Sequence, residues 1–235
     1  MIIYEIQNGE NRKDYVYRVI KDNIMTLELK PGELISEADL SSKLNLSRTP
    51  IREVLMKLKQ EHLIEVKPQA GTYISLIDED LINEAVFMRY VIEKEVIKLA
   101  CEYFSEEMLI ELEKNLFAQK MIKDISGKDV EFHKLDTAFH EILYSGTKNL
   151  NIWESIKKIS THYNRMRLLF DMKRDREEVI KQHEEIVEII KSKSINKVDD
   201  IVTKHIKDPV KYWDKLIDSD EEIRYYLKNR RYKSD

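Results

Sequence analysis

Two arginines and their neighbours, at the start of an expected helix, carry the clearest chemistry in this chain. Ser47, Arg48, Thr49, Pro50 and Arg52 lie within six positions of one another. Ser47 or Thr49 can cap the first amides of a helix, and proline is tolerated only in a first turn. The apolar residues with helical spacing are Ile51, Val54, Leu55 and Leu58. The arginines therefore project from the other face, near the helix N-terminus, where a recognition helix meets DNA.

Positive charge is concentrated around this helix. The 235 residues carry 40 Lys and Arg against 44 Asp and Glu, a formal net charge of −4, so no global field favours nucleic acid. Between positions 43 and 59 the cations are Lys43, Arg48, Arg52, Lys57 and Lys59, and the acid is Glu53. Such a local basic surface favours contact with nucleic acid, although a merely solvated helix face has the same pattern.

A second group of residues has the types and spacing of metal ligands. Asp136 and His140 are four positions apart, which places a carboxylate and an imidazole on one helix face. An isolated pair of this kind more often forms a surface hydrogen bond. His183 and His205 lie beside apolar residues in two other segments, so they can meet the pair only inside a helical bundle. Buried imidazoles need partners, which leaves a polar network or a metal ion.

The segments around the two arginines predict a winged helix-turn-helix over residues 1–77. A helix at about 14–25 precedes a second short helix, which Ser36 caps and Asn45 ends. Only Leu46 separates that end from the cap of the third helix, so the two helices form a tight turn. Residues 63–67 and 72–76 then have strand composition and flank a Pro/Gly turn. The tip of this hairpin, Gln69 to Gly71, can reach the DNA backbone or the minor groove.

Residues 78–235 predict an antiparallel helical bundle, so the fold class is mainly α. Six helices are expected at about 79–103, 105–124, 128–145, 150–171, 174–192 and 195–217. Only five Gly and four Pro occur in the whole chain, which agrees with a mostly helical fold. We interpret the last residues, 225–235, as the frayed end of a helix.

The cysteine content and the hydropathy exclude other classes. The single cysteine, Cys101, rules out an internal disulfide and a cysteine-based zinc site, and its apolar neighbours indicate a buried thiol. No N-terminal signal is present, and no apolar run approaches the roughly 20 residues that span a bilayer. We expect a cytoplasmic protein without a membrane segment.

Several motifs match a known family. Residues 46–55 resemble the hallmark of GntR-family transcription regulators, and residues 29–32 and 68–72 fit the same pattern. Residues 89–93 and 136–140 resemble the all-helical FCD effector domain of the FadR-like branch. The resemblance covers nearly the whole chain. It implies a DNA-binding domain at 1–77 and an effector-binding and dimerisation domain at 78–235.

The resemblance assigns DNA contacts to the first domain. Arg48 and Arg52 would contact phosphates or guanine edges, and Ser47 and Thr49 would hold the helix N-terminus against the backbone. Gly71 would let the wing tip approach DNA closely.

Two positions depart from the family pattern. His62 stands where glycine usually follows the recognition helix, at a cost on the order of 1 kcal/mol in a left-handed conformation. Ala38 replaces an arginine that touches DNA in some relatives.

The resemblance also implies a metal and an effector. Its metal-binding members hold a divalent ion with one Asp and three His, and the matching residues are Asp136, His140, His183 and His205. This ligand set suits Zn, Ni, Mn or Fe, with open positions for a small carboxylate. The candidate carboxylate clamps are Arg89, Arg165 and Arg167, although Arg89 and Glu93 could instead form a surface ion pair. We expect His133 to be exposed and His162 to face a pocket margin or solvent.

These observations predict a homodimeric transcription regulator that reads a pseudo-palindromic, double-stranded operator. A small organic acid near the metal would change the arrangement of the two DNA-binding heads. A purely structural metal is one alternative. A metalloenzyme is another, but no general base is clearly placed beside the ligands, and a DNA-binding head would have no purpose in it.

Overall fold

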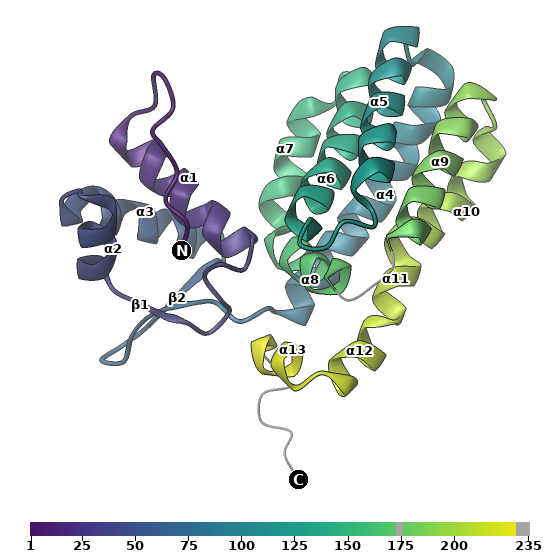
Figure 1. Cartoon of the computed structure of the whole chain (residues 1–235). Coiled ribbons are helices and arrows are strands. Elements are labelled where there is room, and N and C mark those ends of the chain that lie inside the picture. Colours follow the sequence, from purple (N-terminus) through teal and green to yellow (C-terminus); the bar gives the residue numbers. More distant parts are fainter. Residues whose placement is uncertain (173–175, 229–235) are drawn as a thin grey trace. The chain divides into compact units, whose positions relative to one another are not determined.

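A computed structural model describes residues 1–172 and 176–228 of the chain, and these residues form two compact units (Figure 1). The first unit comprises residues 1–80 and 161–166 together with the described residues from 221 onward. The second unit comprises residues 81–160 and the described residues between 167 and 220. In the described part of the chain, no helix is long and apolar enough to cross a membrane.

The first unit contains a winged helix-turn-helix. Its elements are α1 (Arg12–Met25), β1 (Leu34–Ile35), α2 (Glu37–Leu44), α3 (Arg48–Gln60), β2 (Ile64–Lys67) and β3 (Gly71–Ile74). The inward faces of the three helices pack with residues of the sheet in one core, which includes Ile20, Leu40 and Ile51. This arrangement leaves the N-terminal turn of α3 exposed.

Capping residues set the tight connection between α2 and α3. Ser36 accepts a hydrogen bond from the amide of Asp39, and Asn45 takes a left-handed conformation with φ of 52°. Ser47 occupies the N-cap position of α3, but its side chain makes no capping hydrogen bond. The helix therefore begins where the sequence predicts, but the expected capping hydrogen bond to the Ser47 side chain is not formed.

The predicted hairpin forms and gains a third strand. Both pairings are antiparallel, in the order β1-β3-β2, and Glu65 lies opposite Tyr73. Strand β1 pairs Leu34 with Tyr73 and was not predicted, because two residues carry no periodicity. The wing glycine is required here, since a Cβ on Gly71 would lie 2.7 Å from the Leu34 side chain and its φ is 125°. His62 has the left-handed backbone that its position predicts, with φ of 59°.

The second unit is built from long helices around one apolar core (Figure 1). They are α4 (Glu79–Tyr103), α5 (Glu106–Ile122), α6 (Asp129–Gly146), α7 (Leu150–Ile159), α8 (Thr161–Asp171) and α9 (Glu177–Lys191). Residues at the ends of α4 and α8 belong to the first unit. The single helix predicted at 150–171 is instead divided at Ser160, which lies in a turn between α7 and α8.

The last predicted helix contains a π-helical turn. The segment runs through Ile195–Lys197, α10 (Val198–Val202), the π turn (Thr203–Lys207), α11 (Asp208–Lys211), α12 (Trp213–Ser219) and α13 (Glu221–Tyr226). Pro209 has no amide to donate to the carbonyl of His205, and its ring would clash with that carbonyl in a regular helix. A π turn accommodates this mismatch, and it carries the buried side chain of His205.

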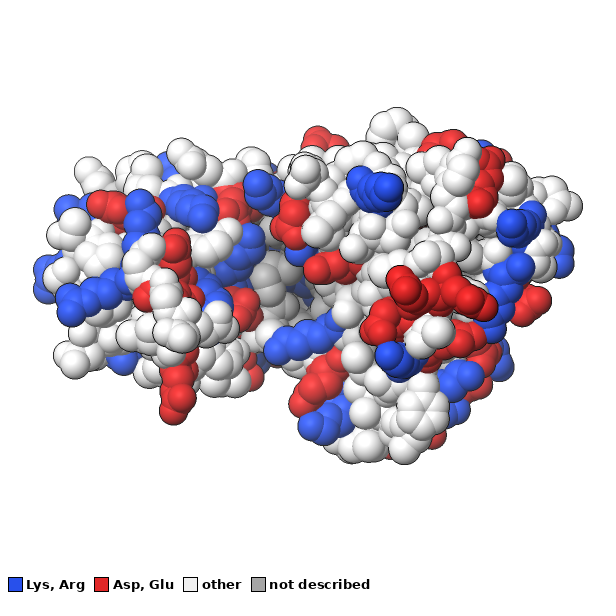
Figure 2. All heavy atoms as spheres, turned by 90° about the horizontal axis from the view of Figure 1, so that it is seen from above, with Lys and Arg blue, Asp and Glu red and all other residues white. Residues whose placement is uncertain are grey.

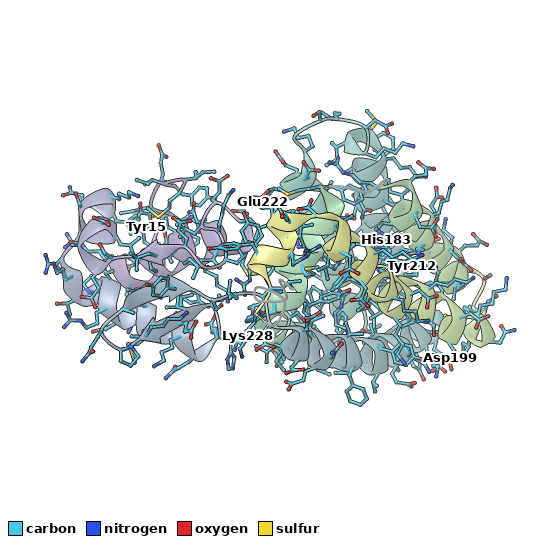
Figure 3. All side chains as sticks on the ribbon, turned by 90° about the horizontal axis from the view of Figure 1, so that it is seen from below. Tyr15, His183, Asp199, Tyr212, Glu222 and Lys228 are labelled. Atoms are coloured by element: carbon cyan, nitrogen blue, oxygen red, sulfur yellow. The ribbon has the colours of Figure 1, made fainter. Side chains whose placement is uncertain are left out.

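A short segment, residues 75–78, leads from β3 to α4 and is held by the C-terminal residues. The Ile77 amide donates to the Tyr226 carbonyl at 2.8 Å, and the Lys228 amide donates to the Ile77 carbonyl at 2.9 Å. Lys228 also pairs with Asp78 at 2.8 Å, and the C-terminal segment is visible in Figure 3. Within the predicted frayed end at 225–235, residues 225–228 are therefore ordered by these contacts, and 229–235 lie outside the described residues.

His162, at the start of α8, is buried in the first unit. Its Nδ1 accepts a hydrogen bond from the Asp78 amide at 2.9 Å, and its Nε2 lies 2.9 Å from the His62 carbonyl oxygen. Because an amide donates and a carbonyl accepts, the ring carries its proton on Nε2 and is neutral. Burial, and then the charge of Arg165, lower the pKa of His162 to about 3. The expectation that His162 faces a pocket margin or solvent is wrong.

The neutral His162 predicts a loss of stability in acid. An unfolded histidine binds a proton below its ordinary pKa of 6.5, whereas the folded one resists protonation down to about pH 3. The free energy of unfolding therefore falls as the pH drops through this range, by up to about 1.4 kcal/mol per pH unit. His162→Gln keeps one donor and one acceptor but does not titrate. Urea unfolding from pH 7 to pH 4 should show the stability advantage of the wild type shrinking, and parallel curves would contradict the assignment.

Candidate metal centre and nucleic-acid interface

The four predicted metal ligands meet in the interior of the second unit. Asp136 and His140 lie on α6, His183 on α9 and His205 on the π turn, and one ligand atom of each lies within 4.8 Å of the others. All four side chains are buried, and His183 lies among the helices (Figure 3). The alternative of a surface hydrogen bond between Asp136 and His140 is therefore wrong, because neither group reaches solvent.

A relay of amides orients His183. Asn115 donates to the carbonyl oxygen of Leu135 at 3.0 Å, so its own side-chain oxygen must face Gln119, which donates to it at 2.7 Å. The remaining oxygen of Gln119 lies 2.9 Å from Nδ1 of His183. Since the Leu135 carbonyl can only accept, every hydrogen bond in this series has a fixed direction, and Nδ1 of His183 must donate.

The other two imidazoles are oriented in the same way. Gln182 donates to a carboxylate oxygen of Glu178 at 3.1 Å and turns its own oxygen to Nδ1 of His205 at 2.9 Å. Nδ1 of His140 lies 2.6 Å from Oε1 of Glu93, which can only accept when ionised. Burial opposes ionisation of Glu93, but His140 and Arg89 lower its pKa below the ordinary value. His183 and His205 therefore carry the proton on Nδ1, and His140 places its Nδ1 against Glu93.

Three imidazole Nε2 atoms then face one another in a buried site. Nε2 of His140 lies 3.2 Å from the unprotonated Nε2 of His205. Nε2 of His183 lies 3.5 Å from Asp136 and has no hydrogen-bond partner among the described residues. Burial lowers the pKa of His183 to about 3 and that of His205 well below its ordinary value, so both stay neutral. These convergent lone pairs, each backed by an acceptor on the opposite nitrogen, fit a divalent cation.

Arg167 supplies the positive charge beside Asp136. Its two terminal nitrogens donate to the two carboxylate oxygens of Asp136, each at 2.7 Å. Burial alone would favour the neutral acid, but Arg167 holds the pKa of Asp136 well below its ordinary value. Asp136 is therefore an anion and can ligate a cation.

The other two candidate effector arginines have different places. Arg89 lies on α4 and pairs with Glu93 at 3.2 Å, and both side chains are buried, so this pair is not a surface one. Arg165 belongs to the first unit, where it donates to the carbonyl of Ser75 at 2.9 Å. Burial lowers the pKa of Arg165 to about 9.

His133, which we expected to be exposed, contacts Asp171 at 3.2 Å and is largely buried.

Sequence reasoning named Arg89 and Glu93 but missed the other residues behind the imidazoles. These form two further polar pairs at a spacing of four, Asn115 with Gln119 and Glu178 with Gln182. Such pairs resemble ordinary solvated helix faces in a sequence. The only available signal was their position within otherwise apolar stripes, and it does not indicate which histidine each pair meets.

The predicted DNA-binding residues lie on the exposed start of α3 and on the wing. Ser47, Arg48, Thr49 and Arg52 are exposed, and Pro50 lies in the first turn. Arg52 makes two hydrogen bonds to Glu37 of α2, at 3.0 and 2.8 Å. On the wing, Gln69 has φ of 60° and is exposed together with Gly71. On the face shown in Figure 2, acidic and basic side chains are interspersed over both units, in agreement with the small net charge.

Comparison with known families matches both units. Residues 12–74 match the family of bacterial regulatory proteins named gntR, and residues 84–208 match the FCD domain. The second match covers more than half of the chain. It includes all four candidate metal ligands and ends before α12 and α13.

Several curated relatives cover most of the chain. The Escherichia coli HTH-type transcriptional repressor RspR is 28% identical over 82% of this chain and 85% of its own length. A Streptomyces ambofaciens HTH-type regulator in an unstable DNA locus is 33% identical over 69% of this chain and 67% of its own length.

Solved structures share the fold. E. coli McbR/YncC has a TM-score of 0.72 at 17% identity, covering 88% of this chain and 99% of that one. A Rhodococcus regulator of the GntR type has a TM-score of 0.69, covering 89% and 99%. None of these relatives is named as an enzyme. The chain is therefore a DNA-binding transcription regulator of the GntR family, in the FadR-like branch whose helical domain is of the FCD type.

Proposed function

We propose that this regulator binds its operator as a homodimer and responds to a small carboxylate at a divalent metal ion. The observation that carries the proposal is the buried convergence of three imidazole nitrogens on Asp136, which Arg167 holds ionised. Ligands of these types at this spacing fit a divalent cation, and Nε2 of His183 has no hydrogen-bond partner among the described residues. The metal would be held by Asp136, His140, His183 and His205.

A bound divalent ion would supply positive charge and open coordination positions for a carboxylate. Four protein ligands leave two positions on a six-coordinate Ni, Mn or Fe ion, and Zn can also enlarge its coordination. Arg89 and Arg167 are the arginines we propose for the effector, because both lie with the residues of the metal site. Arg165 donates to Ser75 in the first unit, so we do not assign it to the effector site.

The DNA-binding surface that we propose consists of Ser47, Arg48, Thr49, Pro50 and Arg52 on α3 with Gln69 and Gly71 on the wing. Arg48 and Arg52 supply positive charge to phosphates or guanine edges. The pairing of Arg52 with Glu37 is exposed, with 68% of the Arg52 side chain accessible. An exposed ion pair contributes at most about 1 kcal/mol, so a phosphate can replace Glu37 at little cost.

The dimer surface that we propose is the outer stripe of α4. Phe87 and Val91, one turn apart, and Leu99 and Tyr103, also one turn apart, are exposed on α4, with Phe87 at 70% and Tyr103 at 73% accessible. Large apolar side chains gathered on one helix favour a partner surface, and a second copy of the chain supplies the same stripe. Two chains would present two heads to a pseudo-palindromic operator.

Residues 1–77 and 78–235 are the functional division that we propose, with the head as output and the bundle as input. The matched family is bacterial, so its DNA target and this protein share the cytoplasm.

Replacing Arg48 by alanine should weaken operator binding by about tenfold and lower the salt dependence by about one phosphate contact. Arg52→Ala should also weaken binding, by slightly less, because the wild-type Arg52 must first give up its weak ion pair with Glu37. Fluorescence anisotropy at several salt concentrations, with a genomic fragment selected by the wild type, measures both effects. Lys114→Ala, an exposed cation on α5, is the control. Unchanged affinity and salt slope in both arginine variants would reject this surface.

Replacing Gln119 by leucine should weaken Ni²⁺ binding by about 10- to 100-fold, because the His183 ring loses the acceptor that fixes its orientation. Calorimetric titration of metal-stripped protein measures the change, and Gln60→Leu on exposed α3 is the matched control. Equal affinities for both variants and the wild type would contradict the relay. Acetate binding to metal-stripped protein that equals binding to loaded protein would indicate a purely structural metal.

Replacing both Phe87 and Val91 by glutamate should convert a dimer into a monomer at micromolar concentration, because like charges would meet across the two-fold interface. Light scattering after size exclusion gives the mass. Phe117→Glu places a charge at an apolar residue of α5 that is 64% exposed, and it should leave the dimer intact. A dimeric double variant would exclude the α4 stripe as the interface.

A further inference from the structure

The hydroxyl of Tyr144 is a buried polar group that the residues of the metal site do not use. Tyr144 is 0% exposed, and its hydroxyl has no hydrogen-bond partner among the described residues. An unpaired buried hydroxyl is unfavourable, and native proteins rarely keep one without a reason. A ligand that enters the site is one such reason.

Tyr144 lies directly beside the candidate metal centre. Asp136, His140 and Tyr144 follow one another at a spacing of four on α6, so they share the buried face of that helix. The ring of Trp153, on α7, lies 5.1 Å from the Tyr144 ring and 6.0 Å from the His140 ring, centroid to centroid. The Trp153 indole therefore packs against both the Tyr144 ring and the His140 ring, the imidazole that would ligate the metal.

The electrostatic surroundings define what Tyr144 can bind. Burial, and then the negative charge of Glu93, raise the pKa of Tyr144 above its ordinary value, so the hydroxyl keeps its proton and can donate. The guanidinium of Arg89 lies 6.0 Å from the centre of the Trp153 ring. Arg89 and Tyr144 therefore both lie against the Trp153 side chain. A donor hydroxyl near a cation selects a ligand with an anionic oxygen.

We propose that Tyr144 is an effector-binding residue whose hydroxyl donates a hydrogen bond to a carboxylate oxygen of the effector. This inference rests on the proposed function, since the other carboxylate oxygen would lie toward the metal held by His140. It adds a neutral donor to the charged clamps, Arg89 and Arg167. The hydroxyl favours ligands that accept a hydrogen bond at this position, whereas the charge of the arginines favours any anion.

The first arm of the test uses the empty protein. Tyr144→Phe removes the hydroxyl and keeps the ring, so the midpoint of urea unfolding should equal or exceed that of the wild type. A lower midpoint would show that the hydroxyl already has a partner without an effector, and it would overturn the inference. Tyr212→Phe, at an exposed position between α11 and α12, controls for loss of a tyrosine hydroxyl in general.

The second arm uses Ni²⁺-loaded protein and acetate, with chloride at equal ionic strength as the reference. Acetate should bind Tyr144→Phe about tenfold or more weakly than it binds the wild type and Tyr212→Phe, because a hydrogen bond to a charged group is lost. Trp153 fluorescence in a Trp213→Phe background reports binding, and Ni²⁺ affinity should be unchanged. Equal acetate affinities would overturn the role of Tyr144 alone. A wild type that binds no Ni²⁺ would overturn the proposed function and this inference with it.

Discussion

The second unit depends on one buried carboxylate. Asp136 is inaccessible to solvent, and an ionised carboxylate in such a place needs opposite charge at contact distance. Arg167 provides that charge through two short hydrogen bonds. Ligand atoms of three imidazoles lie within 4.8 Å of the same carboxylate. The apolar core of the bundle packs around this polar cluster.

The orientation of the imidazoles shows how helix periodicity builds a site in layers. The side chains behind His140, His183 and His205 come from pairs spaced by four on α4, α5 and α9. Each pair ends at a group with a fixed hydrogen-bonding role, so the direction of every bond is determined. Because Nδ1 of His183 and of His205 is engaged in a hydrogen bond, the Nε2 atoms of these rings remain for the centre of the cluster. The Pro209 mismatch and the resulting π turn bring His205 to the same place.

The two units hold their functional arginines in opposite ways. Arg52 is exposed and paired with an exposed acid, so another anion can replace Glu37 at little cost. Arg167 is mostly buried and paired with a fully buried acid, so it can leave Asp136 only if another cation takes its place. The first arrangement suits a surface that exchanges partners with DNA. The second suits a site that responds only to a ligand able to supply charge.

The sequence by itself determined much of the local structure and named the four residues that the fold brings together as candidate ligands. Helical spacing predicted 79–103, which is the observed extent of α4, and turn residues placed the wing and the tight turn at Asn45. It could not predict β1, the break at Ser160 or the π turn, because pairing and packing decide them. Nor could it show that Gln119 and Gln182 face imidazoles, or that His162 is buried. These contacts join residues 23 to 100 positions apart, and only the tertiary structure brings them together.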